Sequence, residues 1–487
     1  MDQGVAPSFK DDPSAYEAPH CDQFGIGPDG KPVADNLTGT GSDAAVKAHD
    51  PDNPHKMTLT SEEQAILNGS KGPVMAKVLE TIVRHGELFG AKRLADCGGK
   101  PHSSLYTGGP WVAPVLEMFE EIADAGLKAF APYTVNPMVI DLYTVGRDPA
   151  KRKMELDGFP LQGRLIQVHT SLGAEPLNNW SCACYLPEIG NVAEPGTVVT
   201  WAESSAVNYG NSVLGIRVNR MATGMEVLCA IAGKVPEFGL VTDEGRRAKW
   251  HIDVQVSEEP NWGTLGTAIG YKVVDQIPYV TGIDKWIGME DGKPNPVAVG
   301  KLKAMGSASA ASGAVGLYHV ENVTPEAIDQ GRGLLTDDHQ TYVVDDAELA
   351  RIRDGFPNLW KDPKGDPNGV YIGCPHNTYD EMVYWCQRLH AALKEAGQEK
   401  LAVPVVLASA PTVKDHLFDE HPLLCRDMKR AGVEFTTICT AAWLGLKGMA
   451  EVERGVTNSG KARCYTNLRL FDDDDIVQIA MTGKAPY

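Results

Sequence analysis

Two cysteines stand just after apolar, strand-like runs of the sequence. Cys374 follows the run Gly-Val-Tyr-Ile at 369–372 and one further glycine, and Cys439 closes the run that begins at Val433. Thiols in such positions could form a metal or iron–sulfur site, a redox pair, or a nucleophile with a second thiol beside it. The residue types alone leave these three kinds of site open.

The segment between the two cysteines alternates helices and strands. We expect a helix over 377–396, a strand over 403–407 and a helix over about 411–431, with a cysteine-bearing strand on either side. This order is typical of a parallel sheet with right-handed crossover connections, in which the carboxyl ends of the strands face one edge. Open α/β sheets bind ligands at that edge. We therefore expect both thiols to face one crevice.

Length, composition and charge limit the class of protein. The 487 residues, 43% hydrophobic and 22% charged, are typical of a soluble globular protein with about three domains. We expect a cytoplasmic protein without membrane contact, because the sequence contains neither a long apolar run nor a secretion signal. Its ten cysteines are then more typically buried, metal-bound or catalytic than disulfide-bonded. The net charge of −19 argues against nucleic-acid binding.

The chain divides near residue 57. Residues 1–56 are polar and predict an N-terminal extension, either a disordered leader or an arm that wraps a partner or a neighbouring subunit. We expect the N-terminal part of the catalytic region at 57–300, including strand-like runs at 165–168 and 197–200. A C-terminal α/β part at 301–487 carries both cysteines described above.

Several polar segments flank the expected strands and helices. Segment 102–109 precedes a helix, 133–137 ends a strand, and 201–205 and 208–212 follow another strand. Taken singly, such residues are more often helix caps or turn residues than ligands of a substrate. Together, their hydroxyls, amides and backbone N–H groups favour a site for a small anionic molecule.

The segment 455–462 nearly matches a phosphate-binding loop. Ala462 stands where that loop needs a magnesium-binding hydroxyl, and residues 449–454 before it have a helical rather than a strand-like pattern. Nucleotide hydrolysis is therefore not expected. Lys461 is either a ligand for a carboxylate or phosphate, or a solvated loop lysine. Catalysis by a thiol nucleophile also has little support, because His376 and Cys374 are too close in sequence to face each other.

Separated motifs indicate a family. From about residue 57 onward the chain resembles the large, catalytic component of the aconitase X group, a branch of the aconitase superfamily. Ser181-Cys182-Ala183-Cys184-Tyr185 is similar to the family's Thr-Cys-Ala-Pro-Tyr segment, and Cys439 stands where the family has Asp-Thr-Cys. The other segments that carry the resemblance are 67–77, 201–215, 312–327, 373–376 and 457–461.

The resemblance implies a fold and a cofactor. The fold would be aconitase-like α/β, with several three-layer α/β subdomains and largely parallel sheets around a central cleft. Cys182, Cys374 and Cys439 would hold an iron–sulfur cluster, favoured as 4Fe–4S with 2Fe–2S as the alternative. Three thiolates on a four-iron cluster leave one iron open to act as a Lewis acid on a substrate hydroxyl. Cys184 is the alternative ligand, and the remaining cysteines are expected to be structural.

The resemblance also implies a hydro-lyase that removes water from a small hydroxy acid. Known members of the group dehydrate cis-3-hydroxy-L-proline or mevalonate 5-phosphate. The alternatives are an isomerase of a different hydroxy acid and a non-catalytic iron-dependent binding protein. His102 and His319 are candidates for proton transfer, or else core histidines, and Lys461 is a third catalytic candidate. The expected substrate-binding residues are Ser103, Tyr106, Thr107, Thr134, Asn136, Glu203, Ser204, Ser205, Asn211, Ser212 and Arg217.

A partner follows from the same resemblance. Aconitase relatives close their active site with a small swivelling domain, which in this group carries a serine-rich loop. No such loop occurs in this sequence; the nearest serine cluster, 307–312, lies inside the expected catalytic region, and 1–56 is too short and too polar to be that domain. We therefore expect a separate small subunit that covers the site and supplies a serine base, with a higher oligomer as a further expectation.

Overall fold

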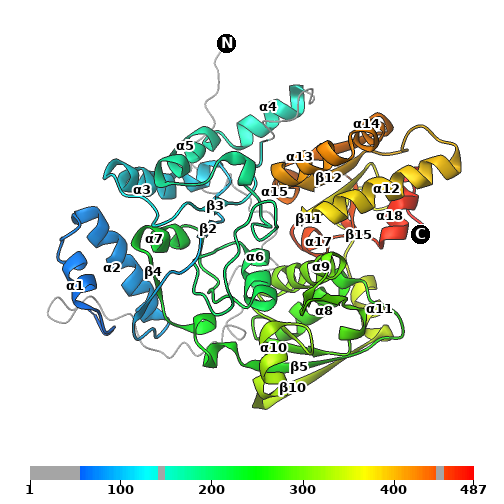
Figure 1. Ribbon diagram of the computed structural model, residues 1–487. Helices are drawn as coiled ribbons and strands as arrows, with labels where there is room; N and C mark the ends of the chain where they lie inside the picture. The colour runs from blue at the N-terminus through cyan, green and yellow to red at the C-terminus, as the bar shows by residue number, and fades with distance from the viewer. Residues whose placement is uncertain (1–54, 141–148, 446–453, 487) are drawn as a thin grey trace. The chain divides into compact units, whose positions relative to one another are not determined.

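The structure is a computed structural model that describes residues 55–140, 149–445 and 454–486 (Figure 1). The chain from His55 onward forms one compact unit. Residues 1–54 of the expected polar extension lie outside the described residues, so both alternatives for that segment stay predictions. Within the described ranges, no helix is long and apolar enough to cross a membrane.

The two cysteine-bearing runs first noted in the sequence belong to a five-stranded parallel sheet. Its strands lie in the order β13–β12–β11–β14–β15. Their bounds are β11 Gly369–Asn377, β12 Val405–Ser409, β13 Val433–Thr436, β14 Gly455–Thr457 and β15 Arg469–Leu470. The predicted alternation is confirmed, with α12 (Tyr379–Ala396) between β11 and β12.

The connection from β12 to β13 differs from the single helix expected over 411–431. It consists of two helices, α13 (Pro411–Glu420) and α14 (Pro422–Ala431). Pro422 has no backbone N–H with which to continue the first helix, and proline is well tolerated in the first turn of a new one. After β13 follow the short α15 (Thr440–Leu444), α17 (Gly460–Tyr465) and α18 (Asp473–Thr482).

A second parallel sheet has four strands in the order β10–β5–β6–β9. Their bounds are β5 Ala248–Gln255, β6 Pro278–Thr281, β9 His319–Val320 and β10 Leu335–Asp345. The helices of this part are α8 (Trp262–Val273), α9 (Pro296–Ser312), α10 (Pro325–Gln330) and α11 (Asp346–Asp354), and a small antiparallel hairpin joins β7 (Met289–Glu290) to β8 (Lys293–Pro294).

In the part that precedes β5, helices make up most of the regular secondary structure. Its helices are α1 (Ser61–Leu67), α2 (Pro73–Leu88), α3 (Ala113–Asp124), α4 (Pro149–Gly158), α5 (Gln162–Leu172), α6 (Ser204–Tyr209) and α7 (Met225–Ala232). Short strands pair as antiparallel β1 (Leu94–Asp96) with β4 (Lys234–Pro236), and as parallel β2 (His102–Ser103) with β3 (Thr134–Val135).

Two of the expected strands differ from the structure. The prediction of a strand at 165–168 is wrong, because these residues lie within α5. Leu165, Val168 and Leu172 recur at helical spacing and are all buried, so they form the inner face of that helix. The run at 197–200 contributes an isolated parallel bridge between Val198 and Arg217.

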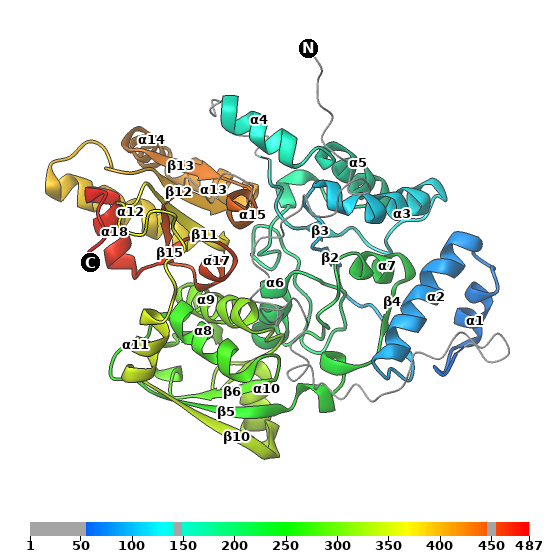
Figure 2. The same cartoon turned by 180° about the vertical axis from the view of Figure 1, so that it is seen from behind.

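Helix α9 packs between the parts of the chain that contain the two sheets. It packs against α8 beside the four-stranded sheet, against α6, and against α17 and β11 of the five-stranded sheet (Figures 1 and 2). Small residues permit this close approach: a Cβ added to Gly266 of α8 would lie 2.1 Å from the carbonyl oxygen of Met305. One hydrophobic core therefore extends through both sheets, and a second core lies among α2, α3, α5 and α7. The predicted α/β class with largely parallel sheets is confirmed.

Candidate active site

Cys374 lies where β11 departs from regular pairing. The strand pairs with β12 through Ile372, and its register then shifts before Asn377 pairs with Ser409. Gly373 has a φ of 109°, and a Cβ at this position would lie 2.2 Å from the carbonyl oxygen of Ala408. Only glycine fits this left-handed, crowded position. The backbone at the first thiol is therefore fixed by an irregular turn inside the strand, which continues through a cis peptide bond to Pro375.

His376 connects the segments that carry the three predicted ligands. Its backbone N–H, two residues after the first thiol, donates to Sγ of Cys182 at 3.4 Å. Its ring Nε2–H donates to the carbonyl of Ile438 at 3.3 Å, so Nδ1 accepts from the hydroxyl of Ser181 at 3.1 Å. Ile438 directly precedes Cys439, and Ser181 directly precedes Cys182. Because burial lowers the pKa of His376 to about 4, the ring is neutral at neutral pH and can keep both hydrogen bonds.

The three thiols share one electrostatic environment. Burial raises the pKa of Cys374 to about 12, and it also raises the pKa of Cys182 and of Cys439 above the ordinary value. The charges of Lys461 and Glu203 act on all three thiols, the ammonium lowering and the carboxylate raising their pKa. Cys374 interacts electrostatically with each of the other two. The structure thus brings together three cysteines from distant parts of the chain.

A buried ion pair lies beside the thiols. Glu203, at the N-cap of α6, and Lys461, in the first turn of α17, form a salt bridge with side chains only 6% and 7% exposed. The carboxylate also accepts from the Ser205 hydroxyl and the Ala206 N–H, both at 2.6 Å. The ammonium donates to the hydroxyls of Ser204 at 3.2 Å and Ser205 at 3.1 Å. Four predicted site residues therefore meet in one charged, hydrogen-bonded cluster.

The ion pair remains charged over a wide pH range. Burial alone would raise the pKa of Glu203, but Lys461 and the surrounding donors lower it overall. Burial alone would lower the pKa of Lys461, and Glu203 raises it overall. At neutral pH the lysine is thus a hydrogen-bond donor and a positive charge, not a base.

Tyr106 lies beside Cys439. Its hydroxyl lies 3.6 Å from Sγ of Cys439. Burial, and to a smaller extent the nearby Cys439 thiol, raise the pKa of this phenol well above its usual value. The tyrosine therefore remains a protonated donor. Thr107 follows in the same loop and is half-buried.

His102 lies in an adjacent polar network. Its Nε2–H donates to Oδ1 of Asn136 at 3.0 Å, and its Nδ1 accepts from the hydroxyl of Thr134, at 2.9 Å. Asn191 in turn donates to Oγ1 of Thr134 at 2.8 Å. Burial lowers the pKa of His102 to about 4. Both ring nitrogens are thus occupied and the imidazole is neutral, which makes His102 a support for this network in the structure described.

Four predicted site residues have partners elsewhere. His319 donates to the carbonyl of Arg246 at 2.9 Å, and the Asn211 amide bonds to Arg246 and to backbone carbonyls. The Ser212 hydroxyl accepts from the backbone N–H of Tyr318 at 2.9 Å. Arg217 bonds to a backbone carbonyl and to Asp243. The structure does not bring these four into the hydrogen-bond network around the thiols, and their roles stay predictions.

Sequence reasoning missed Glu226, a fully buried carboxyl in the first turn of α7. It accepts hydrogen bonds from the Ser103 hydroxyl at 2.8 Å, the Ser104 N–H at 3.1 Å and the Gly224 N–H at 2.6 Å. Burial raises its pKa to about 7. Ser103, predicted to bind substrate, thus holds this carboxyl. Sequence reasoning also missed the bridging role of His376, for which the contiguous Gly-Cys-Pro-His motif was the available signal.

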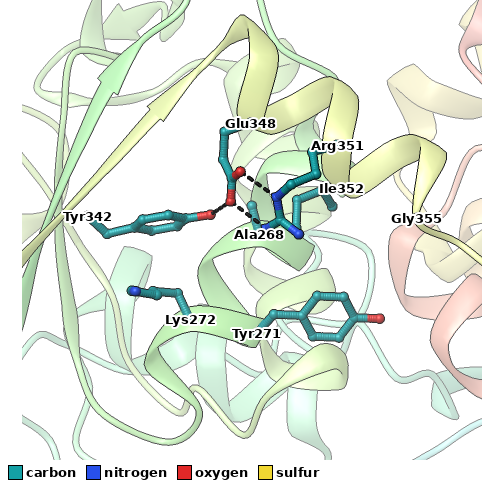
Figure 3. Close-up of a pocket in the computed structure, with 8 residues that line it drawn as sticks. All are labelled: Ala268, Tyr271, Lys272, Tyr342, Glu348, Arg351, Ile352 and Gly355. Carbon is teal, nitrogen blue, oxygen red and sulfur yellow. Dashed lines mark hydrogen bonds and ion pairs between the residues drawn. The ribbon is translucent and has the colours of Figure 1, made fainter.

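A separate surface hollow of about 290 Å³ lies between α8, β10 and α11. In Figure 3, Glu348 bridges Tyr342 and Arg351, and Lys272 lies on the opposite side of the hollow. The residues that line it are Ala268, Tyr271, Lys272, Tyr342, Glu348, Arg351, Ile352 and Gly355. None of the predicted site residues lines it, so this hollow is not the site built around the thiols.

Comparisons with known proteins agree with these features. Residues 56–244 match the family model described as the aconitase X first domain, and residues 248–354 match that of the aconitase X second domain. The phosphomevalonate dehydratase large subunit of Thermococcus kodakarensis is 30% identical over 365 residues, which are 74% of this chain and 82% of the relative.

Two further comparisons bear on the fold and the reaction. The cis-3-hydroxy-L-proline dehydratase of Pseudomonas aeruginosa is 32% identical over 281 residues, 56% of this chain and 44% of that relative. The crystal structure of Thermococcus kodakaraensis aconitase X in its holo form is similar with a TM-score of 0.70 and 27% identity, and the match covers 87% of this chain and all of that one.

Proposed function

The chain belongs to the aconitase X family, and from this premise we propose that it is the large subunit of an iron–sulfur-dependent hydro-lyase that removes water from a small hydroxy acid. The observation that carries the proposal is the meeting of Cys182, Cys374 and Cys439 beside the buried Glu203–Lys461 pair. The names of both kinds of relative support dehydration as the reaction.

The residues present fit an iron–sulfur cluster. Within the described residues, no three His, Cys, Asp or Glu side chains are spaced to hold a single metal ion. A cluster suits these thiols, because each thiolate binds a different iron and the ligands therefore lie farther apart than those of one ion. We assign Cys182, Cys374 and Cys439 as its ligands and favour the 4Fe–4S form. When bound, a cluster with an open iron supplies a Lewis acid that polarises a substrate hydroxyl.

The chain's own side chains would orient the substrate. Lys461 keeps its positive charge and is the donor best placed to hold a substrate carboxylate next to the thiols. The Ser204 hydroxyl, whose hydrogen bond to Glu203 is long at 3.4 Å, would complete the binding of that carboxylate. Tyr106 remains protonated and would donate to an oxygen near Cys439. Of the three predicted catalytic residues, Lys461 therefore has the strongest structural support.

A partner is the second part of the proposal. The relative from Thermococcus kodakarensis is named a large subunit, which supports a small subunit for this chain. The serine cluster at 307–312 cannot act as the missing loop, because it lies in α9 and its hydroxyls donate to carbonyls of the same helix. We propose that a swivel-domain subunit with a serine-rich loop covers the site, excludes water and supplies the base.

The cluster assignment is tested by iron and sulfide analysis of protein purified and reconstituted under anaerobic conditions. Serine variants of Cys182, Cys374 and Cys439 should each lose most of the iron. Cys386 and Cys425 are matched controls, since both are buried in helices of the same sheet region, and their serine variants should keep it. Full iron content in all three ligand variants would defeat the assignment.

The reaction is tested with mevalonate 5-phosphate and cis-3-hydroxy-L-proline, each with and without a swivel-domain subunit from a relative. Mevalonate 5-phosphate comes first, because the match covers a larger share of that relative than of the hydroxyproline enzyme. Dehydration that requires the added subunit supports both parts of the proposal. Full activity of this chain alone would defeat the partner, and a loaded cluster without turnover of any hydroxy acid would favour a binding protein.

A further inference from the structure

The hydroxyl of Tyr185 is buried without a hydrogen-bond partner among the described residues. The side chain is only 5% exposed, so bulk solvent has little access to the hydroxyl. A buried O–H without an acceptor is unfavourable and calls for a specific explanation. Such a group beside a site that binds a cofactor indicates an acceptor that arrives with the cofactor.

The ring of Tyr185 is held in a fixed position. It stacks on Tyr209 with ring centroids 3.9 Å apart and an angle of 8° between the planes. Tyr185 also follows Cys182 by three residues in the same tight turn, where the backbone N–H of Ala183 donates to the Ser181 hydroxyl. The stack and the turn together fix where the hydroxyl can reach.

The neighbours of this phenol identify the direction of the missing acceptor. Burial raises the pKa of this phenol most, and Tyr209, Cys182, Glu203 and Cys184 raise it further, so these four groups lie near the ring. Cys182 also precedes Tyr185 by three residues in the same turn, whereas the Cys184 thiol has Thr134 as a hydrogen-bond partner. The carboxylate of Glu203 is already satisfied, with donors from Lys461, Ser205 and the Ala206 backbone. The side of Cys182 is therefore where an acceptor would satisfy the hydroxyl.

We propose that the Tyr185 hydroxyl donates a hydrogen bond to a sulfur atom of the iron–sulfur cluster on the side held by Cys182. This inference rests on the proposed function, since it needs the cluster to be present. Donors to the sulfur atoms of a cluster stabilise its more negative, reduced form and so raise its reduction potential. Tyr185 thus contributes to the electronic properties of the cluster without being one of its ligands.

The test is a redox titration of the anaerobically reconstituted protein, followed by electron paramagnetic resonance. Tyr185→Phe keeps the stacked ring and removes the donor, so it should keep the iron content and shift the reduction potential to a more negative value. Tyr209→Phe is the matched control, because it removes a hydroxyl from the other ring of the same stack, and its potential should equal that of the wild type.

Unchanged potential in a fully loaded Tyr185→Phe variant would overturn the inference, and a raised KM with unchanged potential would assign the hydroxyl to the substrate instead. Should that variant bind no cluster, 3-fluorotyrosine at position 185 gives an independent measurement: its more acidic hydroxyl is a stronger donor and should shift the potential to a more positive value, and no shift would count against the inference. Wild-type protein that takes up no iron would instead refute the proposed function.

Discussion

The ion pair between Glu203 and Lys461 allows a direct test of how the site is held together. Lys461→Met removes the ammonium and keeps a side chain of similar length. It leaves the carboxylate of Glu203 buried, with donors from the Ser204 and Ser205 hydroxyls and the Ala206 N–H as its remaining partners. Removing one member of a buried pair costs about 3–5 kcal/mol of unfolding free energy. Because three donors to the carboxylate remain, we expect a loss near the lower end, about 3 kcal/mol.

The loss should depend on pH. In the wild type the pKa of Glu203 is lowered, so its stabilising contribution is present above the unfolded carboxyl value of about 4.3 and is lost as pH falls through the folded value. The pKa of Lys461 is raised, so its contribution is present below about 10.4 and is lost only above that value. In the Met variant the lysine no longer offsets the effect of burial, which favours the protonated form of Glu203. The difference in unfolding free energy between the wild type and the variant should therefore become smaller as pH falls from 8 towards 5.

The assay is urea unfolding of the cluster-free protein, followed by tryptophan fluorescence at pH 8 and pH 5.5. Lys71→Met is the matched control, because Lys71 pairs with Glu62 on the surface, where the side chains are 54% and 71% exposed. An exposed pair contributes less than about 1 kcal/mol, so the control should unfold almost like the wild type. A Lys461→Met protein as stable as that control at pH 8, or equally destabilised at both pH values, would refute the reasoning.

Three further predictions concern the supports of the site. Gly373→Ala should lower both stability and iron content, because the new Cβ meets the Ala408 carbonyl at 2.2 Å, whereas Gly397→Ala, also at positive φ but with open space, should leave the iron content unchanged. His376→Phe should reduce iron content by breaking the hydrogen bonds to Ser181 and Ile438, measured against His390→Phe at an exposed position; full loading would contradict this role. Glu226 has a folded pKa of about 7, above its unfolded value, so its ionisation costs stability as pH rises through 7. Relative to the wild type, Glu226→Gln should therefore gain urea resistance between pH 5 and pH 8, and parallel pH profiles would contradict the shifted pKa.

The sheet that carries Cys374 was predictable because its signals are local. Apolar runs of strand length alternate there with amphipathic runs of helix length, and parallel connectivity then places the strand ends at one edge. The strand expected at 165–168 failed for the same local reason. A run of four residues with three apolar side chains fits both the two-residue period of a strand and the 3.6-residue period of a helix. Leu172, one turn farther on, is needed to recognise the helix.

The proximity of Cys182 and Cys374 in the fold could not be predicted from local sequence patterns. The two residues belong to separate parts of the chain, and only the family resemblance indicated that they meet. In the structure the His376 N–H donates to the Cys182 sulfur from β11, whose register shifts between Ile372 and Asn377. A shift of register at one glycine has no hydrophobic period by which sequence reasoning could detect it.

Lys461 shows most clearly what the sequence does and does not specify. The sequence pattern predicts no strand directly before the segment around Lys461, yet β14 lies at Gly455–Thr457 and α17 starts at Gly460. The strand is short and begins at the first glycine of the segment itself, so the pattern of the residues before that glycine could not indicate it. What still separates the segment from a nucleotide site is Ala462, together with the partner of the lysine. In a phosphate-binding loop the lysine ammonium meets the phosphates directly, whereas this ammonium is held in place by a buried carboxylate 258 positions away in the sequence. That pairing fixes the lysine beside the thiols, and no pattern within either segment could have predicted it.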